Sequence, residues 1–237
     1  MTTAGATHSG PGTVTQGDLS AAADATRGDL VAAAIDYFGL HGYQGASTRA
    51  IAAAAGKPMS AITYHFGGKH GLYLAAAHHV AEQMNGLFAS ARKASATLDP
   101  SAPDPQGARE GLYAMQTAAI SMLTRRDVEA YARFIIGEQA DRTEAFDILY
   151  NELMEPLCVH VSMLLRMASG GRLDEQGGRL RATMLIGQLF MFRLCRATVL
   201  RNMGWSDIGE EERVLLLQAA RAHLDTMLES LNEETNA

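Results

Sequence analysis

The stretch TRGDLVAAAIDYFGLHGYQGASTRAIAAAAGKPMSAITYHFGGKHGLY, residues 26–73, decides the fold of this chain. Within it, apolar residues recur at the three-to-four-residue spacing of a helix in three separate runs, and glycines stand between the runs. No run shows the strict alternation of apolar and polar residues that is typical of a strand. The stretch therefore predicts three short helices in close succession.

Residues suited to helix ends stand at the borders of these runs. Thr26 and Asp29 have the form of a capping pair at the start of the first helix, which should end at Gly42. Either Ser47 or Thr48 can cap the second helix. The second helix should end at Gly56, because glycine breaks helices. The third helix should start near Pro58, because proline suits a first helical turn, and should end at Gly67-Gly68.

Two short helices joined by a glycine turn are the arrangement of a helix-turn-helix, in which one helix braces and the next enters the major groove of DNA. The pattern is equally compatible with three helices that only pack against one another. Its most specific part is YHFGGKHGLY, residues 64–73. With that segment, residues 26–73 resemble the N-terminal domain of TetR-family transcriptional regulators almost position for position.

The resemblance implies an all-α fold. An N-terminal three-helix bundle with a helix-turn-helix would be joined by a long connector helix to a larger helical ligand-binding and dimerisation domain, with about nine helices in all. We expect the DNA-binding domain at residues 24–84 and the effector-binding and dimerisation domain at residues 95–232. Residues 1–22 are rich in small and polar residues and should form a disordered tail.

The resemblance also implies which residues meet DNA. The second helix and the start of the connector helix would hold phosphates, and the third helix would face base edges. Met59 stands where the family often has lysine, and Thr63 where it often has tyrosine, so we expect few cationic contacts and a shallow salt dependence. Lys57 is either a phosphate contact or an ordinary solvated lysine. The implied DNA-binding residues are Ser47, Thr48, Arg49, Lys57, Met59, Ser60, Ala61, Thr63, Tyr64, His65 and Lys69.

The rest of the chain also has helical periodicity. The connector helix should run from Lys69 to about Arg92, and a cluster of prolines within residues 98–106 predicts a loop. Pro156 lies inside a continuous pattern and should kink its helix near residue 152, because proline cannot donate a backbone hydrogen bond. The remaining helices are expected at residues 106–125, 127–139, 143–168, 176–203 and 208–232.

Two segments, ARFIIGEQADRTEAFDILYNELMEPLCVHVSMLL and GQLFMFRLCRATVLRNMGW, resemble the C-terminal domain of the CecR-like branch of TetR regulators. This resemblance implies a helical core that dimerises through its last two long helices. Apolar stripes on both helices suit a two-fold four-helix bundle, although such stripes can also cover the core of their own subunit. The predicted dimer-interface residues are Leu180, Met184, Gly187, Met191, Leu216, Leu224 and Leu228.

An effector pocket is expected among the helices of the second domain, where polar residues stand among large apolar ones. Such a mixture suits a small lipophilic ligand, although each of these residues taken singly is more often part of a core. The candidate ligand-binding residues are Tyr113, Met122, Arg133, Phe134, Glu138, Phe146, Tyr150, Met154, His160, Gln188 and Phe192.

Composition excludes several other classes of protein. The net charge is −6 and 19% of residues are charged, so DNA binding must rest on local pattern rather than on a basic surface. The cysteines Cys158 and Cys195 have no metal-binding spacing, and no paired Glu-x-x-His motif or phosphate-binding loop is present. We therefore expect no enzyme activity, no cofactor and no metal site. The sequence lacks a run of eighteen apolar residues and a signal-peptide pattern, which favours a cytoplasmic protein without membrane contact.

The function expected from these observations is a ligand-released repressor that binds a pseudo-palindromic, double-stranded DNA operator as a homodimer. A small lipophilic effector would shift the connector helix and change the separation of the two recognition helices. The alternative is a helical protein-interaction module without DNA binding, which the acidic charge balance would suit.

Overall fold

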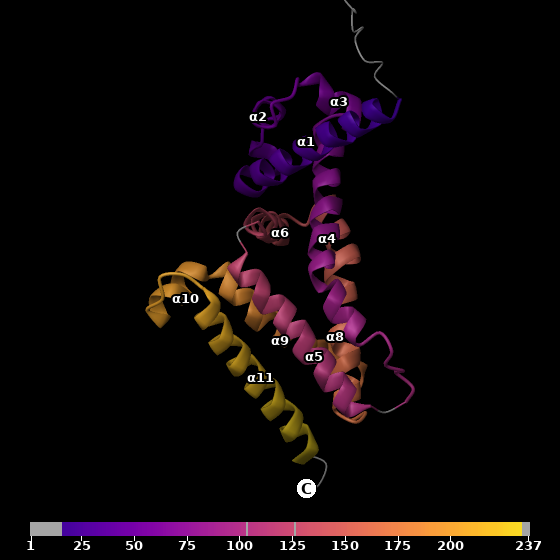
Figure 1. The fold of residues 1–237 in the computed structure, drawn as a ribbon, viewed down its shortest axis with the longest axis vertical. Helices are drawn as coiled ribbons and strands as arrows, with labels where there is room; N and C mark the ends of the chain where they lie inside the picture. Colours follow the sequence, from indigo (N-terminus) through magenta and orange to yellow (C-terminus); the bar gives the residue numbers. More distant parts are fainter. Residues whose placement is uncertain (1–15, 103, 126, 234–237) are drawn as a thin grey trace, which may run out of the picture.

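The computed structural model describes residues 16–102, 104–125 and 127–233, and within them it contains helices and no strand. Figure 1 shows an elongated molecule with the first three helices gathered at one end. A single long helix leads from them into a larger helical assembly. This arrangement confirms the predicted all-α fold class.

The N-terminal part consists of four helices: α1 Gln16–Gly45, α2 Thr48–Ala54, α3 Ser60–Phe66 and α4 Lys69–Ala94. The connector predicted from Lys69 is therefore confirmed as α4. Gly42 has φ 66° and ψ 175°, which are not helical values, and it ends the regular part of α1 where the sequence predicts. Gly67, with φ 73°, ends α3 in the left-handed conformation that glycine adopts readily.

The start of α1 differs from the prediction. The helix begins at Gln16, so residues 16–22 are helical and the tail predicted there is wrong. The alanine-rich segment SAAADA has a high helix propensity and continues the helix upstream. The hydroxyl of Thr26 does not cap a helix start; it donates to the carbonyl of Ala22, 2.9 Å away, within the helix. Residues 1–15 of the predicted tail lie outside the described residues.

The larger assembly contains the remaining helices. They are α5 Pro105–Ser121, the 3₁₀ turn η1 Met122–Thr124, α6 Glu129–Asp141, α7 Glu144–Leu149, the π-helical turn η2 Tyr150–Met154, α8 Glu155–Ala168, α9 Glu175–Leu194, α10 Arg196–Met203 and α11 Glu210–Glu233. Asp104 caps the start of α5 by accepting a hydrogen bond from the amide of Gly107, and Asp174 caps the start of α9 by accepting one from the amide of Gly177.

The distortion predicted from Pro156 takes the form of the π turn η2. Because Pro156 has no amide hydrogen, the carbonyl of Glu152 lacks its usual partner one turn ahead. That carbonyl accepts a hydrogen bond of 2.7 Å from the side chain of Asn85 on α4, and the amide of Glu155 reaches the carbonyl of Tyr150. The carbonyl that the proline leaves without a backbone partner thus links η2 to α4 through Asn85.

The continuous helix predicted over residues 176–203 is wrong. The chain bends by 83° between α9 and α10, at Cys195. No glycine or proline stands at this bend, so the sequence gives no local signal of it. In the described part of the chain no single helix is long and apolar enough to cross a membrane, and the bent pair α9 and α10 passes that test only when taken together.

The hydrophobic core of the N-terminal helices continues into α6 and α7. Phe38 on α1 and Tyr73 on α4 belong to the same buried cluster as Phe134 on α6 and Leu149 on α7. The two helices α1 and α6 meet closely at Gly39, where an added Cβ would lie 3.2 Å from the backbone nitrogen of Phe134. Because the two backbones are so close, α6 cannot shift towards α1 without displacing α1.

Candidate DNA-binding face and effector cavity

The helix α3 presents a small, exposed and mostly uncharged surface. Ile62 is buried and anchors the helix in the N-terminal core, whereas Tyr64 is 83% exposed and Met59 is 58% exposed. Ser60 and Thr63 are also exposed, and Ala61 is half-buried. Such a surface can make apolar contacts to thymine methyl groups and hydroxyl hydrogen bonds to base edges or phosphates.

The preceding helix α2 packs against α3. Ser47 stands at its N-cap in an extended conformation, but its side chain makes no capping hydrogen bond. Ser47 and Arg49 are exposed and Thr48 is half-buried. The hydroxyl of Ser47 and the guanidinium of Arg49 therefore remain accessible to a phosphate.

The two lysines of this region differ in their surroundings. Lys57 forms an ion pair of 2.9 Å with Asp29 on α1, so part of its charge is already neutralised within the chain. The ammonium of Lys69 lies 4.8 Å from the ring centre of Tyr43 and 3.4 Å from the carbonyl of Gln44. These contacts position the ammonium of Lys69, which is the first residue of α4. His65, half-buried on α3, packs between Tyr64 and Phe66.

Three residues predicted to bind an effector instead join the N-terminal helices to α6. The carboxylate of Glu138 is 6% exposed and accepts hydrogen bonds from the hydroxyls of Tyr73 and Thr143. Phe134 is buried against Tyr73, and Arg133 pairs with Glu129 and Asp36. The prediction of effector contacts at these three residues is therefore corrected: partners within the chain engage the carboxylate of Glu138 and two guanidinium nitrogens of Arg133, although Nε of Arg133 is buried without a partner among the described residues.

A cavity of about 660 Å³ lies among α4, α5, α6, η2, α8 and α9, and we call it the central cavity. Most of its lining is apolar, including Phe88, Met115 and Phe190. Polar side chains also reach it, among them Gln116 and Arg193. Of the predicted ligand-binding residues, the structure brings Met122, Phe146, Tyr150 and Met154 to this lining.

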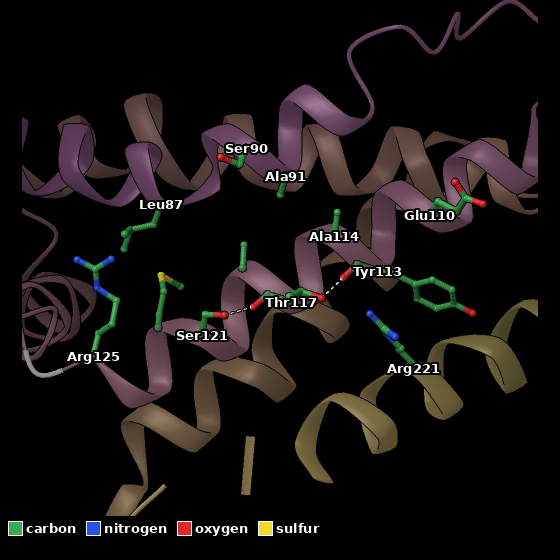
Figure 2. A pocket seen from close by; sticks show the side chains of 12 residues that line it. Leu87, Ser90, Ala91, Glu110, Tyr113, Ala114, Thr117, Ser121, Arg125 and Arg221 are labelled. Carbon is green, nitrogen blue, oxygen red and sulfur yellow. Dashed lines mark hydrogen bonds between the residues drawn. The ribbon is translucent and has the colours of Figure 1, made fainter. Parts of the chain in front are cut away.

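A second, more open depression of about 590 Å³, the outer groove, lies between α4, α5 and α11 (Figure 2). Tyr113 lines it, and its hydroxyl donates to Asp225 at 2.5 Å while Arg221 lies 5.1 Å from the centre of its ring. Burial and the adjacent Asp225 carboxylate raise the pKa of Tyr113. The hydroxyls of Thr117 and Ser121 donate to carbonyls one turn back, as Figure 2 shows. These polar groups of the groove are already engaged within the chain.

Other predicted effector contacts lie away from the central cavity. Phe192 packs in a separate cluster with Ile120 and Leu216, and Gln188 is half-buried outside the lining. His160 is hydrogen-bonded to Ser95, with 3.1 Å between Nε2 and Oγ. The predictions for Phe192, Gln188 and His160 are corrected accordingly, because apolar character and helical position do not specify which cavity a side chain reaches.

Comparison with known proteins decides the family. Residues 108–231, more than half of the chain, match the C-terminal domain of the HTH-type transcriptional dual regulator CecR, and residues 30–76 match the tetR family of bacterial regulatory proteins. CecR of Shigella flexneri is 33% identical over 207 residues, which cover 87% of this chain and 92% of CecR. The chain belongs to the TetR family, in its CecR branch.

Another relative and two solved structures resemble parts of this chain or its fold. AcnR of Corynebacterium glutamicum, a transcriptional repressor, is 41% identical over 59 residues, or 25% of this chain and 31% of AcnR. A transcriptional regulator from Pseudomonas aeruginosa PAO1 has a similar fold, with a TM-score of 0.63 and 21% identity over 88% of this chain and 92% of that one. The structure of a TetR-family regulator from Mesorhizobium loti has a TM-score of 0.59 and 17% identity, and the match covers 88% of this chain and 97% of that one.

An apolar face of this TetR-family chain is left uncovered on α9. Leu180 is 60% exposed and Met184 is 65% exposed, and with Gly187, Met191 and Leu194 they form what we call the α9 stripe. These residues follow each other at intervals of three or four and so lie on one side of the helix. Among the residues that the structure describes, no atom lies within 4 Å of a Cβ added at Gly187, so a second helix can approach closely there.

The predicted contribution of α11 to a dimer interface is wrong for three residues. Leu216, Leu224 and Leu228 are buried in the core of their own chain, with Leu224 and Leu228 against α5 and α8. Among the described residues of α11, the large apolar side chains that are exposed are instead Val214 and Leu215. The helical pattern identifies the apolar side of α11 but does not specify which part of it the subunit's own core covers.

Two polar residues of the central cavity, Gln116 and Arg193, are absent from the residues predicted to bind an effector; for Arg193 the sequence suggests either a pair with Glu138 inside the cavity or a solvated surface charge. Gln116 is a single amide on the apolar side of α5, between Leu112 and Ala119, and that position is the signal that could have identified it. Arg193 gives no comparable signal, because it stands near the end of a helix among other arginines. Among the described residues no group of three or more His, Cys, Asp or Glu could hold a metal ion.

The environment of His160 predicts an effect of pH on stability. Burial, and secondly the charge of Arg92, lower the pKa of His160. The folded chain therefore binds this proton more weakly than the unfolded chain, so stability should fall as the pH drops below about 6.5, the ordinary value for histidine. Urea unfolding at several pH values should show a smaller acid loss for His160→Gln than for the unsubstituted chain. Identical pH dependences would contradict this expectation.

Proposed function

We propose that this regulator represses transcription as a homodimer on a pseudo-palindromic operator and releases DNA when a small lipophilic effector fills the central cavity. The observation that carries the DNA-binding part is the exposed surface of α3, on which Tyr64 is 83% exposed. Met59, Ser60 and Thr63 are exposed with it, and Arg49 is exposed on α2, so this part of the chain offers an aromatic ring, hydroxyls and a cation to DNA. The DNA-binding residues proposed here are those predicted from the sequence, with Lys57 weakened by its pair with Asp29.

A route for coupling runs from the central cavity to α4. Tyr150 and Met154 of the π turn line the cavity, and the same turn is bonded to α4 through Asn85 and the carbonyl of Glu152. His78 on α4 lies 2.8 Å from a carboxylate oxygen of Glu152. A ligand that moves η2 would thus displace α4, whose first turn carries Lys69. Coupling free energies of this kind are typically about 1 to 3 kcal/mol.

Operator binding by single variants tests the DNA-binding face. We expect Tyr64→Ala to weaken binding to DNA from upstream of the gene by about tenfold or more, since it removes the most exposed contact on α3. Lys69→Ala should weaken binding to all sequences and reduce the slope of log affinity against log salt by about one. Fluorescence anisotropy with labelled DNA at several salt concentrations measures both effects.

The matched control is Lys93→Ala, because Lys93 carries the same charge on the same helix but lies in its last turn, far from α3. It should leave operator affinity unchanged. Full operator binding by both Tyr64→Ala and Lys69→Ala would refute the placement of the recognition helix. It would favour the alternative function, a protein-interaction module, for which the acidic balance of the chain is the supporting observation.

The remaining parts of the proposal follow from the family and the sequence. We place the protein in the cytoplasm, where an operator is accessible, and assign it no catalytic activity and no cofactor. The relative from Shigella flexneri is named a dual regulator, so transcription from the target promoter with and without this protein decides between repression and activation.

A further inference from the structure

Gln116 lines the central cavity and carries a buried hydrogen-bond acceptor without a partner among the described residues. Its side chain is 6% exposed, and its Nε2 donates to the carbonyl of Ala220 on α11 at 2.9 Å. Only the NH₂ group of the amide can make that bond, so the orientation of the amide is fixed. The Oε1 atom is left buried, with no hydrogen-bond partner among the described residues. A buried acceptor without a partner is costly, and a ligand donor would relieve that cost.

Arg193, near the end of α9, brings an unpaired donor to the same cavity. Its Nη2 is buried and has no hydrogen-bond partner within the described part of the chain. Burial is the main reason that its pKa lies below the ordinary value for arginine. A guanidinium keeps its charge in proteins, so the cavity holds a positive charge in a largely apolar wall.

The charges near Arg193 are already committed to other partners. Glu129 pairs with Arg133, and Asp127 pairs with Arg125. Arg196 also lies near Arg193, where its positive charge lowers the pKa of Arg193, and it pairs with Asp207. An anion that enters the cavity would therefore meet a guanidinium whose Nη2 is free to donate.

Two further charged residues line the central cavity. Arg179 forms an ion pair of 3.1 Å with Glu175, and both side chains are at least half exposed to solvent. Glu155, in the first turn of α8, is half-buried. The uncharged polar side chains of Gln139, Tyr150 and Thr183 also line the cavity, and those of Gln139 and Thr183 already donate within the chain. The rest of the lining is predominantly apolar, so the unpaired atoms of Arg193 and Gln116 are the groups that most need a ligand partner.

We propose that the central cavity binds a lipophilic carboxylic acid, with its carboxylate accepting from Nη2 of Arg193 and its chain packed among the apolar residues. A hydroxyl or amide N–H on the ligand would donate to Oε1 of Gln116 and increase affinity. This inference rests on the proposed effector role of the cavity and names the chemical class of the effector. Charged hydrogen bonds are about twice as strong as neutral ones, so the carboxylate should dominate selectivity.

Calorimetric titration of the full-length protein without DNA tests the carboxylate. We expect dodecanoate to bind about tenfold or more tightly than dodecanol, and dodecylamine to bind more weakly than either, all below their micelle-forming concentrations. Arg193→Gln should abolish the preference for dodecanoate over dodecanol. Arg201→Gln, which removes an exposed arginine of α10 outside the cavity lining, should retain it. Circular dichroism establishes that each variant is folded.

A second variant tests the acceptor and keeps the inference testable if Arg193→Gln does not fold. Gln116→Leu should abolish any gain that hydroxydodecanoates show over dodecanoate, because it removes the acceptor that the ligand hydroxyl would meet. The inference is overturned if none of these compounds binds, if dodecanol or dodecylamine binds as tightly as dodecanoate, or if the preference survives Arg193→Gln. It is also overturned if Gln116→Leu leaves the gain from the hydroxyl unchanged. Because these titrations contain no DNA, their outcome is independent of operator binding, and a regulator that binds its operator but ignores carboxylates would refute this inference alone.

Discussion

Gly71→Ala is expected to destabilise the DNA-binding helices by roughly 2 to 4 kcal/mol and to abolish operator binding, although position 71 does not face DNA. A Cβ added at Gly71 would lie 1.9 Å from the carbonyl oxygen of Phe66, the last residue of α3. The obstacle is backbone, which cannot rotate away as a side chain can. Relief requires α3 to move relative to α4, and that movement displaces Tyr64 from its place on the recognition surface.

Gly86 provides a matched control on the same helix. It is exposed, and nothing lies within 4 Å of a Cβ added there. Gly86→Ala should therefore stabilise the chain by up to about 1 kcal/mol through helix propensity alone. Chemical denaturation and operator titration of both variants measure the contrast. Equal stability of the two variants, or unimpaired operator binding by Gly71→Ala, would show that the turn between α3 and α4 tolerates a side chain.

The N-terminal helices could be predicted from sequence because the signals that define them are local. Gly42 and Gly67 take backbone conformations in which glycine is favoured, and Ile62 lies on the one apolar side of a short helix. The same reasoning correctly placed the distortion caused by Pro156. In each case the residue that carries the signal is itself the cause of the structural feature.

The candidate site was harder to predict because its features are not local. Whether Glu138 faces an effector or the hydroxyl of Tyr73 depends on how α4 and α6 pack, and these residues are far apart in sequence. The bend at Cys195 has no glycine or proline to mark it. Leu224 shows the same problem on α11: periodicity gives the apolar side of the helix but not the partner that covers it.

The uncovered α9 stripe leads to the second prediction with a large effect. Met184 is 65% exposed at its centre and contributes little to the core of its own chain. In a two-fold dimer the same surface patch of each subunit lies at the interface, so Met184→Glu would bring two carboxylates into an apolar contact. We expect the variant to be a folded monomer at micromolar concentration. Sedimentation velocity measures this, and Met184→Leu, which keeps an apolar side chain, should remain dimeric.

The loss of the dimer should reduce operator affinity by about 100-fold or more, because each half-site would then be bound independently. In the proposed dimer, one bound recognition helix would hold the other near the next major groove, about 34 Å away along the DNA. The residues that contact DNA are unchanged in Met184→Glu, so affinity for an isolated half-site should be preserved, which distinguishes this variant from Tyr64→Ala. A Met184→Glu variant that remains dimeric with full operator affinity would exclude the α9 stripe as the interface. The exposed residues Val214 and Leu215 of α11 would then be the next surface to test in the same way.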